Sequence, residues 1–203
     1  MKIKNAILPA LAALLMFPCV LHAEELENPA EGAVRRVYNT DINYAGNGPG
    51  AYQRYLETFA NTAQRLYRGG GEAPYAVGVD TDGQFRTVSS DGWHPEMAMW
   101  TGFLKRNNGG VYSLVISAPG GGNKFPLYSL WVNGRQLVSA GTETTALNVA
   151  LEPGFNEICL VMNSTRRFGI ELGIKKQDSI KEPKSIGPGE LWHEDELDDE
   201  DED

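Results

Sequence analysis

The residues with the clearest chemical potential are two acids and a histidine in one short segment, Asp91, His94 and Glu96. Carboxylates and imidazoles are the groups that bind metal ions and transfer protons. Gly92 and Pro95 lie in the same segment and indicate a turn, where polar residues are usual. We therefore expect a surface loop here and no metal site.

Other catalytic arrangements find little support. A serine nucleophile would need His94 as its base, and the chain has no nucleophile-elbow sequence. A pair of carboxylates for glycoside hydrolysis stays open, because spacing singles out none of the acids expected on loops, Asp80, Asp82, Asp91, Glu96 and Glu143. The glycine runs at 69–71 and 120–122 lack the Lys-Ser/Thr that binds phosphate. We predict that the protein is not an enzyme and has no catalytic residue and no cofactor.

Aromatic side chains are the better indication of function. In the expected strand at 127–132, Trp131 shares one face with Leu127 and Ser129. If that face lies on the solvent side, Trp131 presents a flat ring for stacking, together with Trp93. If it lies inside, Trp131 belongs to the core, which is the interpretation that we favour. The candidate ligand-binding residues are Trp93, Trp131, Asn133 and Arg135.

The N-terminus has the features of a cleavable secretory signal. Lys2 and Lys4 form a positive start, residues 6–21 are mostly apolar, and Ala23 ends a small-residue cleavage pattern. A retained membrane anchor is the alternative, but the apolar segment is short for a span of about 20 residues. We predict a signal peptide at 1–23. The mature protein is then secreted, periplasmic or on the cell surface, with no membrane span after signal cleavage.

Cysteine content and charge limit the mature protein further. Cleavage leaves Cys159 as the only cysteine, so no intramolecular disulfide can form, and its apolar neighbours indicate a buried thiol. The formal net charge is −9, and nine carboxylates lie in the last ten residues. Because the chain has no cluster of Lys and Arg, we exclude nucleic acid as a partner.

The pattern of apolar residues changes along the chain. Residues 24–50 are polar and end in turn formers, which indicates a linker. Helical spacing then predicts a helix at 51–68, stopped by glycines. Short apolar runs fill 73–176, with Asn133-Gly134 as the strongest hairpin signal. Residues 177–203 are polar and acidic, and we expect them to be disordered.

These patterns together predict a mostly β protein. The expected strands are Tyr75–Val79, Gln84–Val88, Met97–Leu104, Val111–Ala118, Leu127–Asn133, Gln136–Ser139, Thr145–Leu151, Phe155–Met162 and Phe168–Ile174. No long helical pattern interrupts them. An antiparallel β-sandwich or jelly roll follows, with one N-terminal amphipathic helix and a disordered acidic tail.

Four motifs in this region occur in a suggestive order. They are Trp-Thr-Gly-Phe-Leu at 100–104, Gly-Gly-Val-Tyr-Ser-Leu at 109–114, Leu-Trp-Val-Asn-Gly at 130–134 and Leu-Glu-Pro-Gly-Phe-Asn at 151–156. Over roughly residues 93–175 the chain thereby resembles the β-sandwich domain named after anthrax protective antigen. The last two of these motifs in this chain are also similar to the jelly-roll sugar-binding domains attached to many secreted glycosidases. Both resemblances imply a β-sandwich and a role with carbohydrate, in adhesion or at envelope surfaces.

One departure from the first family concerns calcium. Its members that bind sugar through calcium often carry paired aspartates on the loop before the Trp-containing hairpin. The corresponding loop at 118–124 has no carboxylate here, whereas calcium takes about six or more oxygen ligands. We predict no metal at this position.

Our hypothesis from the sequence is an exported, non-catalytic module that binds glycans or cell-envelope components. The alternative is a structural or assembly subunit of an extracytoplasmic or surface complex, in which the helix and the acidic tail contact other subunits. A glycan or an envelope protein is the expected partner.

Overall fold

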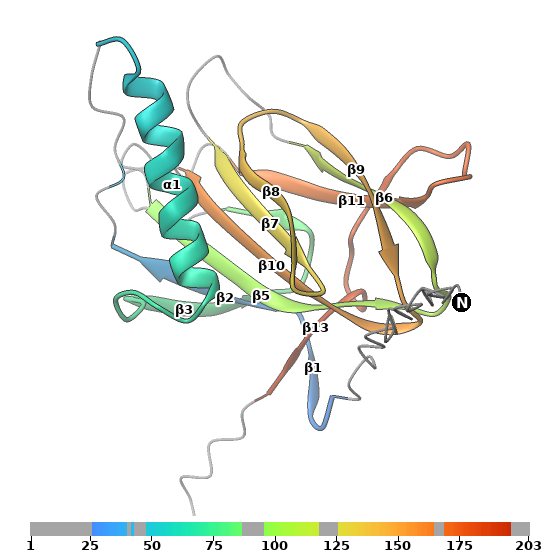
Figure 1. Ribbon diagram of the computed structural model, residues 1–203. Coiled ribbons are helices and arrows are strands. Elements are labelled where there is room, and N and C mark those ends of the chain that lie inside the picture. Colours follow the sequence, from blue (N-terminus) through green and yellow to red (C-terminus); the bar gives the residue numbers. More distant parts are fainter. Residues whose placement is uncertain are drawn as a thin grey trace, which may run out of the picture.

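The protein is a β-sandwich with one helix outside it. The computed structural model describes residues 26–39, 42, 48–86, 96–117, 126–164 and 169–195. Within these ranges, two antiparallel sheets lie face to face and a single helix packs on one of them (Figure 1). The predicted fold class is confirmed.

The first sheet has eight strands and is built on two long ones. Its strands are β1 (Pro29–Glu31), β2 (Ala33–Tyr38), β3 (Ala76–Asp80), β5 (Glu96–Arg106), β7 (Leu127–Val132), β8 (Arg135–Gly141), β10 (Gly154–Ser164) and β13 (Leu191–Glu194). The central strands β5 and β10 pair over their full length, from Arg106 opposite Gly154 to Glu96 opposite Ser164. On one side β10 is followed by β7 and β8. On the other side β5 pairs with β2 along one part of its length and with β13 along another. The strand β2 also pairs with β3, and β13 also pairs with β1.

The second sheet has five strands. They are β4 (Gln84–Phe85), β6 (Gly110–Ser117), β9 (Thr145–Leu151), β11 (Ile170–Lys176) and β12 (Lys184–Ser185). The strand β11 pairs with β6, β4 and β12, and β6 also pairs with β9. Among the described residues, Asp82-Gly83 and Asn107-Asn108-Gly109 lie between strands, as the sequence pattern predicts.

Apolar side chains from both sheets fill the space between them. Trp100 and Leu104 of β5 and Leu130 of β7 meet Leu114 of β6 and Leu172 of β11, all at most 2% exposed. Strand residues alternate between the two faces of a sheet, so the residues directly before and after each of these core residues point outward. The outer face of the eight-stranded sheet therefore carries the odd-numbered residues of β5 and β10.

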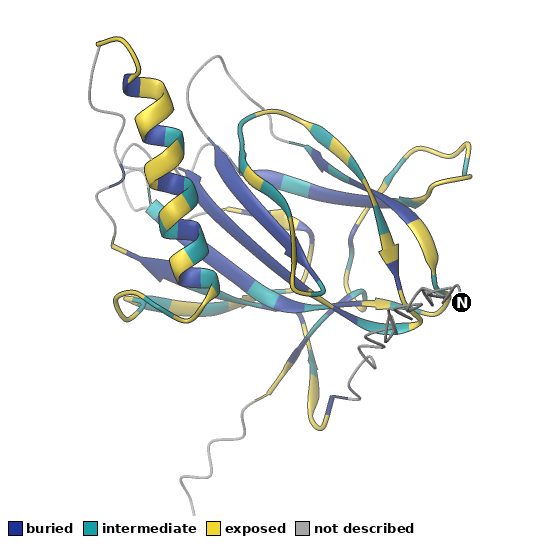
Figure 2. Cartoon of the chain, viewed as in Figure 1, coloured by how far each residue is buried: buried dark blue, intermediate teal, exposed yellow. Residues whose placement is uncertain are grey.

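The helix α1 (Ala51–Tyr67) covers part of that outer face. Its buried residues recur at helical spacing, and Tyr55, Phe59 and Ala63 face the sheet while the opposite side is exposed (Figure 2). The helix ends at glycine, as predicted: Gly69 has φ 73° and donates to the carbonyl oxygen of Leu66 at 2.9 Å. Helix and sheet form a second hydrophobic cluster, separate from the core between the sheets.

Two of the predicted domain boundaries differ from the structure. Residues 24–50, expected to be a linker, contain β1 and β2, and Val37 is fully buried at 0% exposure. Residues 177–203, expected to be disordered, contain β12 and β13, with Leu191 also at 0% exposure. Both β2 and β13 pair with the remote strand β5, and a local sequence pattern does not reveal such pairing.

Some predicted segments fall outside the described residues. These are the signal peptide at 1–23 and the acidic end of the chain from residue 196. Within the described ranges, the structure contains no helix with the length and apolar character needed to span a bilayer.

The docking of α1 can be tested at Phe59, which is fully buried at 0% exposure against the sheet. We expect Phe59→Ala to lower the free energy of unfolding by about 3–5 kcal/mol, because it removes a large apolar side chain and leaves a cavity. Urea denaturation followed by circular dichroism measures the change. The exposed Glu57→Gln serves as the control and should shift stability by less than about 0.5 kcal/mol. Equal effects of the two variants would contradict the packing of α1 described here.

Candidate ligand-binding surface

Trp131 lies in the interior of the molecule. It belongs to the outer face of the eight-stranded sheet, where α1 covers it and leaves it 2% exposed. Its ring stacks on Tyr67 of α1, with centroids 4.7 Å apart and planes 7° from parallel. Trp131 is therefore a core residue, which is the interpretation that we favour from the sequence. In this arrangement the Trp131 ring is not open to a ligand, which corrects its candidacy as a stacking platform.

The other candidate residues are dispersed. Asn133 and Gly134 form the predicted tight turn between β7 and β8, with φ of 48° and 73°. The Asn133 side-chain amide donates to Oδ1 of Asn156 at 3.0 Å, so it supports the hairpin. Arg135 is exposed at the start of β8, and Trp93 lies outside the described residues. A ligand-binding role for these residues stays a prediction.

Two of the acids that were expected on loops lie in strands, Asp80 at the end of β3 and Glu96 at the start of β5, and Asp80 has a structural role. Asp80 accepts hydrogen bonds from Arg35 at 2.9 Å and from the indole N–H of Trp100 at 2.6 Å. Asp91 and His94 lie outside the described residues. Among the residues that the structure describes, no three His, Cys, Asp or Glu side chains are grouped closely enough to hold a metal ion.

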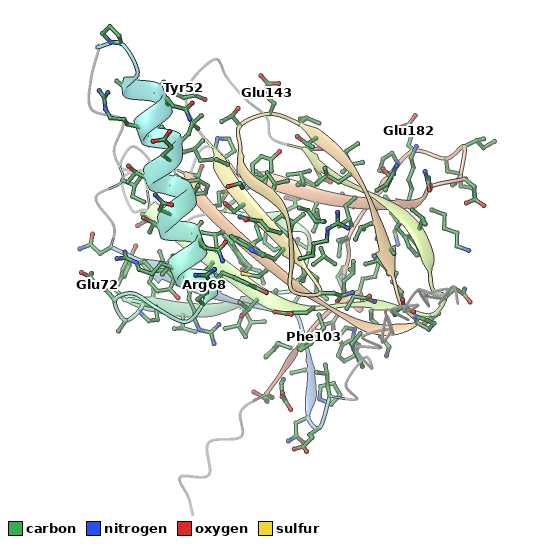
Figure 3. All side chains as sticks on the ribbon, viewed as in Figure 1. Tyr52, Arg68, Glu72, Phe103, Glu143 and Glu182 are labelled. Atoms are coloured by element: carbon green, nitrogen blue, oxygen red, sulfur yellow. The ribbon has the colours of Figure 1, made fainter. Side chains whose placement is uncertain are left out.

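A different set of side chains forms an open aromatic surface. We call Phe103, Phe155, Trp192 and Lys105 the aromatic cluster. The Phe155 ring lies 6.3 Å from that of Phe103 and 6.2 Å from that of Trp192, both edge to face. Lys105 Nζ lies 4.8 Å from the Trp192 ring centre and 5.3 Å from that of Phe155. The three rings are half-buried and Lys105 is exposed, so part of each ring faces outward (Figure 3, Phe103 labelled).

Strand register brings the aromatic cluster together. Phe103 of β5 is paired with Trp192 of β13, and Lys105 with Phe155 of β10. Antiparallel partners point to the same face of a sheet, so all four side chains share the outer face. The helix α1 covers this face at Trp131 and leaves it uncovered at the aromatic cluster. Three strands from distant parts of the sequence thus build one surface.

Polar groups border the rings. Glu157 of β10 is paired with Phe103 and is exposed on the same face. On the next row, Thr101 accepts a hydrogen bond from Arg36 at 2.8 Å. Glu157 lies two residues before Cys159, the partner of Trp131, so it stands on the outer face between the Tyr67–Trp131 stack and the rings. Partial burial and then the Glu157 charge raise the pKa of the Tyr67 phenol. The surface therefore combines apolar ring faces with charged and hydroxyl groups at its edge.

Such a surface suits a ligand with both apolar and polar sides. Aromatic rings supply large rigid contact area at little entropic cost, and Trp is among the residues that most often dominate binding energy. A pyranose ring has this dual character, since one face carries C–H groups and its edge carries hydroxyls. Because the rings stand on paired strands, the surface is already formed before a ligand arrives.

Sequence reasoning overlooked the aromatic cluster. The expected strands include Phe103 and Phe155 but give these residues no role in binding. Trp192 lies in the segment that the sequence predicts to be disordered. A signal was present in Leu191-Trp192-His193, which follows the Gly187-Pro188-Gly189 turn and alternates as a short strand does. The acidic residues directly after it obscured that signal.

Comparison with known proteins supports the fold. The chain matches no family model and no curated protein. Among solved structures it is similar to the epithelial adhesin 6 A domain from Candida glabrata, which was determined in complex with Galb1-3GlcNAc. The TM-score is 0.55 at 15% identity, covering 87% of this chain and 93% of that one.

Two further structures are similar. The PA14 domain of the MpAFP antifreeze protein has a TM-score of 0.52 at 8% identity, covering 84% of this chain and 94% of that one. An anti-sigma factor domain-containing protein from Clostridium clariflavum has a TM-score of 0.52 at 16% identity, over 85% of this chain. The chain spans 51% of the length of that protein. At sequence identities of 8–16%, the likeness to these proteins is a likeness of fold alone.

The state of Cys159 tests how tightly α1 seals the face beside the aromatic cluster. The thiol is 2% exposed, and burial raises its pKa from 9.0 to about 12, with a smaller contribution from the Glu157 charge. In the chain without residues 1–23, which keeps Cys159 as its one cysteine, we expect no reaction of the folded protein with a thiol reagent at pH 8, and one equivalent of reaction in urea, measured by absorbance. Rapid labelling of the folded protein would show that the helix does not shield this face.

The same raised pKa predicts a dependence of stability on pH. The unfolded thiol loses its proton above pH 9, whereas the folded thiol keeps it until about pH 12. This contribution to stability is therefore fully present below pH 9 and is lost as the pH rises toward 12. Between pH 9 and pH 12, Cys159→Ala should therefore lose less of its free energy of unfolding than the wild type loses.

Proposed function

We propose that this protein is a non-catalytic module that binds glycans or other envelope components outside the cytoplasm, and that the aromatic cluster is its contact surface. The observation that carries the proposal is the set of three half-buried rings on a rigid sheet face, bordered by polar groups. The export signal predicted at residues 1–23 supports the location. The fold shared with an adhesin domain that was solved with Galb1-3GlcNAc supports the type of ligand.

The geometry of the rings suggests how a sugar is held. Phe103 and Trp192 each stand nearly perpendicular to Phe155, so they form a corner with faces in two directions. A pyranose ring in this corner places its C–H face on one ring, and its hydroxyls reach Glu157. The ammonium of Lys105 lies over two rings and donates to the sugar oxygens once it moves aside.

Substitution of Trp192 tests this proposal. In a glycan array followed by calorimetry with the best-bound glycan, we expect Trp192→Ala to weaken binding at least tenfold, or about 1.4 kcal/mol, because it removes the largest ring. Trp192→Phe keeps a ring and should retain most of the affinity. Val111→Ala, an exposed apolar position on the second sheet, is the matched control.

Two results would contradict this function. One is that no glycan or envelope preparation is retained by the folded wild-type protein. The other is that Trp192→Ala binds as tightly as the wild type while its circular dichroism and thermal midpoint are unchanged.

A second candidate function, assembly with further copies of this chain, is favoured by strand β3. Outward-facing Tyr75, Val77 and Val79 are 54%, 64% and 48% exposed. Within the described ranges β3 pairs only with β2, so one of its edges has free backbone groups. Natural proteins usually protect such edges with charges, prolines or bulges, and residues 75–79 have none of these. An exposed apolar edge of this kind favours addition of another strand.

The strand is suited to pair with its own copy. With Gly78 on a two-fold axis, Val77 of one copy lies opposite Val79 of the other, so the apolar side chains meet on one face. The charged residue of β3, Asp80, is already neutralised by Arg35 at 2.9 Å, so pairing brings no uncompensated charge into contact.

Val77→Lys tests this assembly. We expect the wild type to form a dimer as its concentration rises, and Val77→Lys to remain monomeric, because the charge would lie in the apolar contact. Sedimentation velocity over a concentration series measures the difference. Val111→Lys is an equivalent change on the second sheet and should not affect the dimer. A wild type that is monomeric at all concentrations would remove this candidate.

A further inference from the structure

A polar hollow lies on the opposite side of the sandwich from the aromatic cluster. Its volume is about 330 Å³, at the lower end of the range of small-molecule sites, roughly 300–1,000 Å³. It is lined by residues of β4, β6 and β11 and by the turn between β8 and β9, which Glu143 marks in Figure 3. We define the polar hollow by the side chains of Gln84, Arg86, Ser117, Thr144 and Glu171.

Four of these side chains form one row across the outer face of the five-stranded sheet. Glu171 of β11 is paired with Gln84 on one side and with Ser117 on the other. Thr144 comes next in the row, because its neighbour Thr145 is paired with Ile116. Strands lie about 4.8 Å apart, so the row spans about 14 Å. That length matches one to two linked sugar rings.

The fifth side chain, Arg86, is held at one end of the row. It lies two residues from Gln84 and therefore on the same face. A Cβ atom on Gly169 would lie 2.6 Å from Arg86 Cγ and 2.6 Å from the carbonyl oxygen of Phe85. Glycine at position 169 thus allows the aliphatic part of Arg86 to lie close against the backbone of the neighbouring strand. Arg86 is exposed and lines the hollow on the side of β4.

The other end of the hollow is fixed by a buried tyrosine. Tyr128 has no exposed surface, and its hydroxyl donates to the carbonyl oxygen of Glu143 and lies 3.0 Å from Thr145 Oγ1. These contacts hold the turn that carries Thr144. A Cβ on Gly141 would lie 2.4 Å from the Tyr128 ring, so this position requires glycine if the tyrosine is to stay in place.

We propose that the polar hollow is a second ligand site, which takes a hydroxyl-rich ligand bearing a carboxylate, of the chemical class of a uronic-acid residue in an acidic glycan. The site lies on the five-stranded sheet and shares no residue with the aromatic cluster. It therefore extends the function proposed above and does not depend on it.

The donor and acceptor types of the lining groups define this class. A guanidinium binds a carboxylate through two parallel hydrogen bonds, a geometry that a neutral hydroxyl cannot match. Glu171 only accepts hydrogen bonds when ionised, so it selects hydroxyl donors. Ser117, Thr144 and Gln84 both donate and accept, as hydroxyl groups in variable orientation require. The ligand's carboxylate lies at Arg86, and its hydroxyls lie along the row toward Thr144.

Other ligand classes fit less well. A divalent cation needs several oxygen ligands with carboxylates among them, and the described lining of the hollow has one carboxylate, Glu171. A nucleic acid backbone needs a series of positive charges, and among the residues that the structure describes Arg86 is the one cation in the lining. A purely apolar ligand would displace water from the charged groups of Arg86 and Glu171 without replacing its hydrogen bonds.

Calorimetry with digalacturonate, its methyl ester and the neutral disaccharide cellobiose tests the proposal on the purified full-length chain. We expect digalacturonate to bind, and the methyl ester and cellobiose to bind at least tenfold more weakly. Arg86→Gln and Glu171→Gln should each weaken digalacturonate binding at least tenfold. Arg54→Gln removes an exposed arginine from α1 and is the matched control, with affinity within twofold of the wild type.

The same experiment separates this site from the aromatic cluster. Trp192→Ala should leave digalacturonate binding within twofold of the wild type, whatever its effect on other glycans. The proposal is overturned if digalacturonate does not bind, if the methyl ester binds as tightly, or if Arg54→Gln weakens binding as much as Arg86→Gln. It is also overturned if Trp192→Ala abolishes digalacturonate binding while Arg86→Gln, with an unchanged circular dichroism spectrum, does not.

Discussion

The pairing of β5 with β10 is the constraint on which the remaining structure depends. The two strands are in register over eleven residues, from Arg106 opposite Gly154 to Glu96 opposite Ser164. Alternation along them assigns every side chain either to the core between the sheets or to the outer face. Leu104 and Phe103 are neighbours in sequence, yet one is a core residue and the other belongs to the aromatic cluster. A slip of one residue would exchange these two roles and abolish both the core and the surface.

The outer face of this sheet is too apolar to be left uncovered along its whole length. At one end α1 buries Trp131, Cys159 and their neighbours, and the stack of Tyr67 on Trp131 holds the last turn of the helix against the sheet. At the other end the rings of the aromatic cluster shield one another, and Lys105 covers them in part. The difference in cover explains why a tryptophan of β7 is structural whereas a tryptophan of β13 is available to a ligand.

Local patterns in the sequence were sufficient for the elements whose apolar residues recur with the period of a helix or a strand. The helix was expected at 51–68 and is found at Ala51–Tyr67, and β9 at Thr145–Leu151 agrees at both ends. The Asn133-Gly134 hairpin is confirmed by its two positive φ angles. The strands β2 and β13 were missed because they lie inside polar stretches of sequence and are held by pairing with β5, far away in the chain. Because β13 was not predicted, Trp192 was not recognised as a candidate binding residue.

The two sheets also present different chemistry on their outer faces, and the reason is how each face is shielded. The eight-stranded sheet carries α1, so part of its outer face is an apolar packing surface, and the end that α1 does not cover has aromatic rings. The five-stranded sheet has no helix over it among the described residues, and its outward positions in β4, β6 and β11 are polar at the end beside Thr144. A sandwich with one apolar and one polar outer face can contact two chemically distinct ligands at once, because neither face has to move for the other to bind.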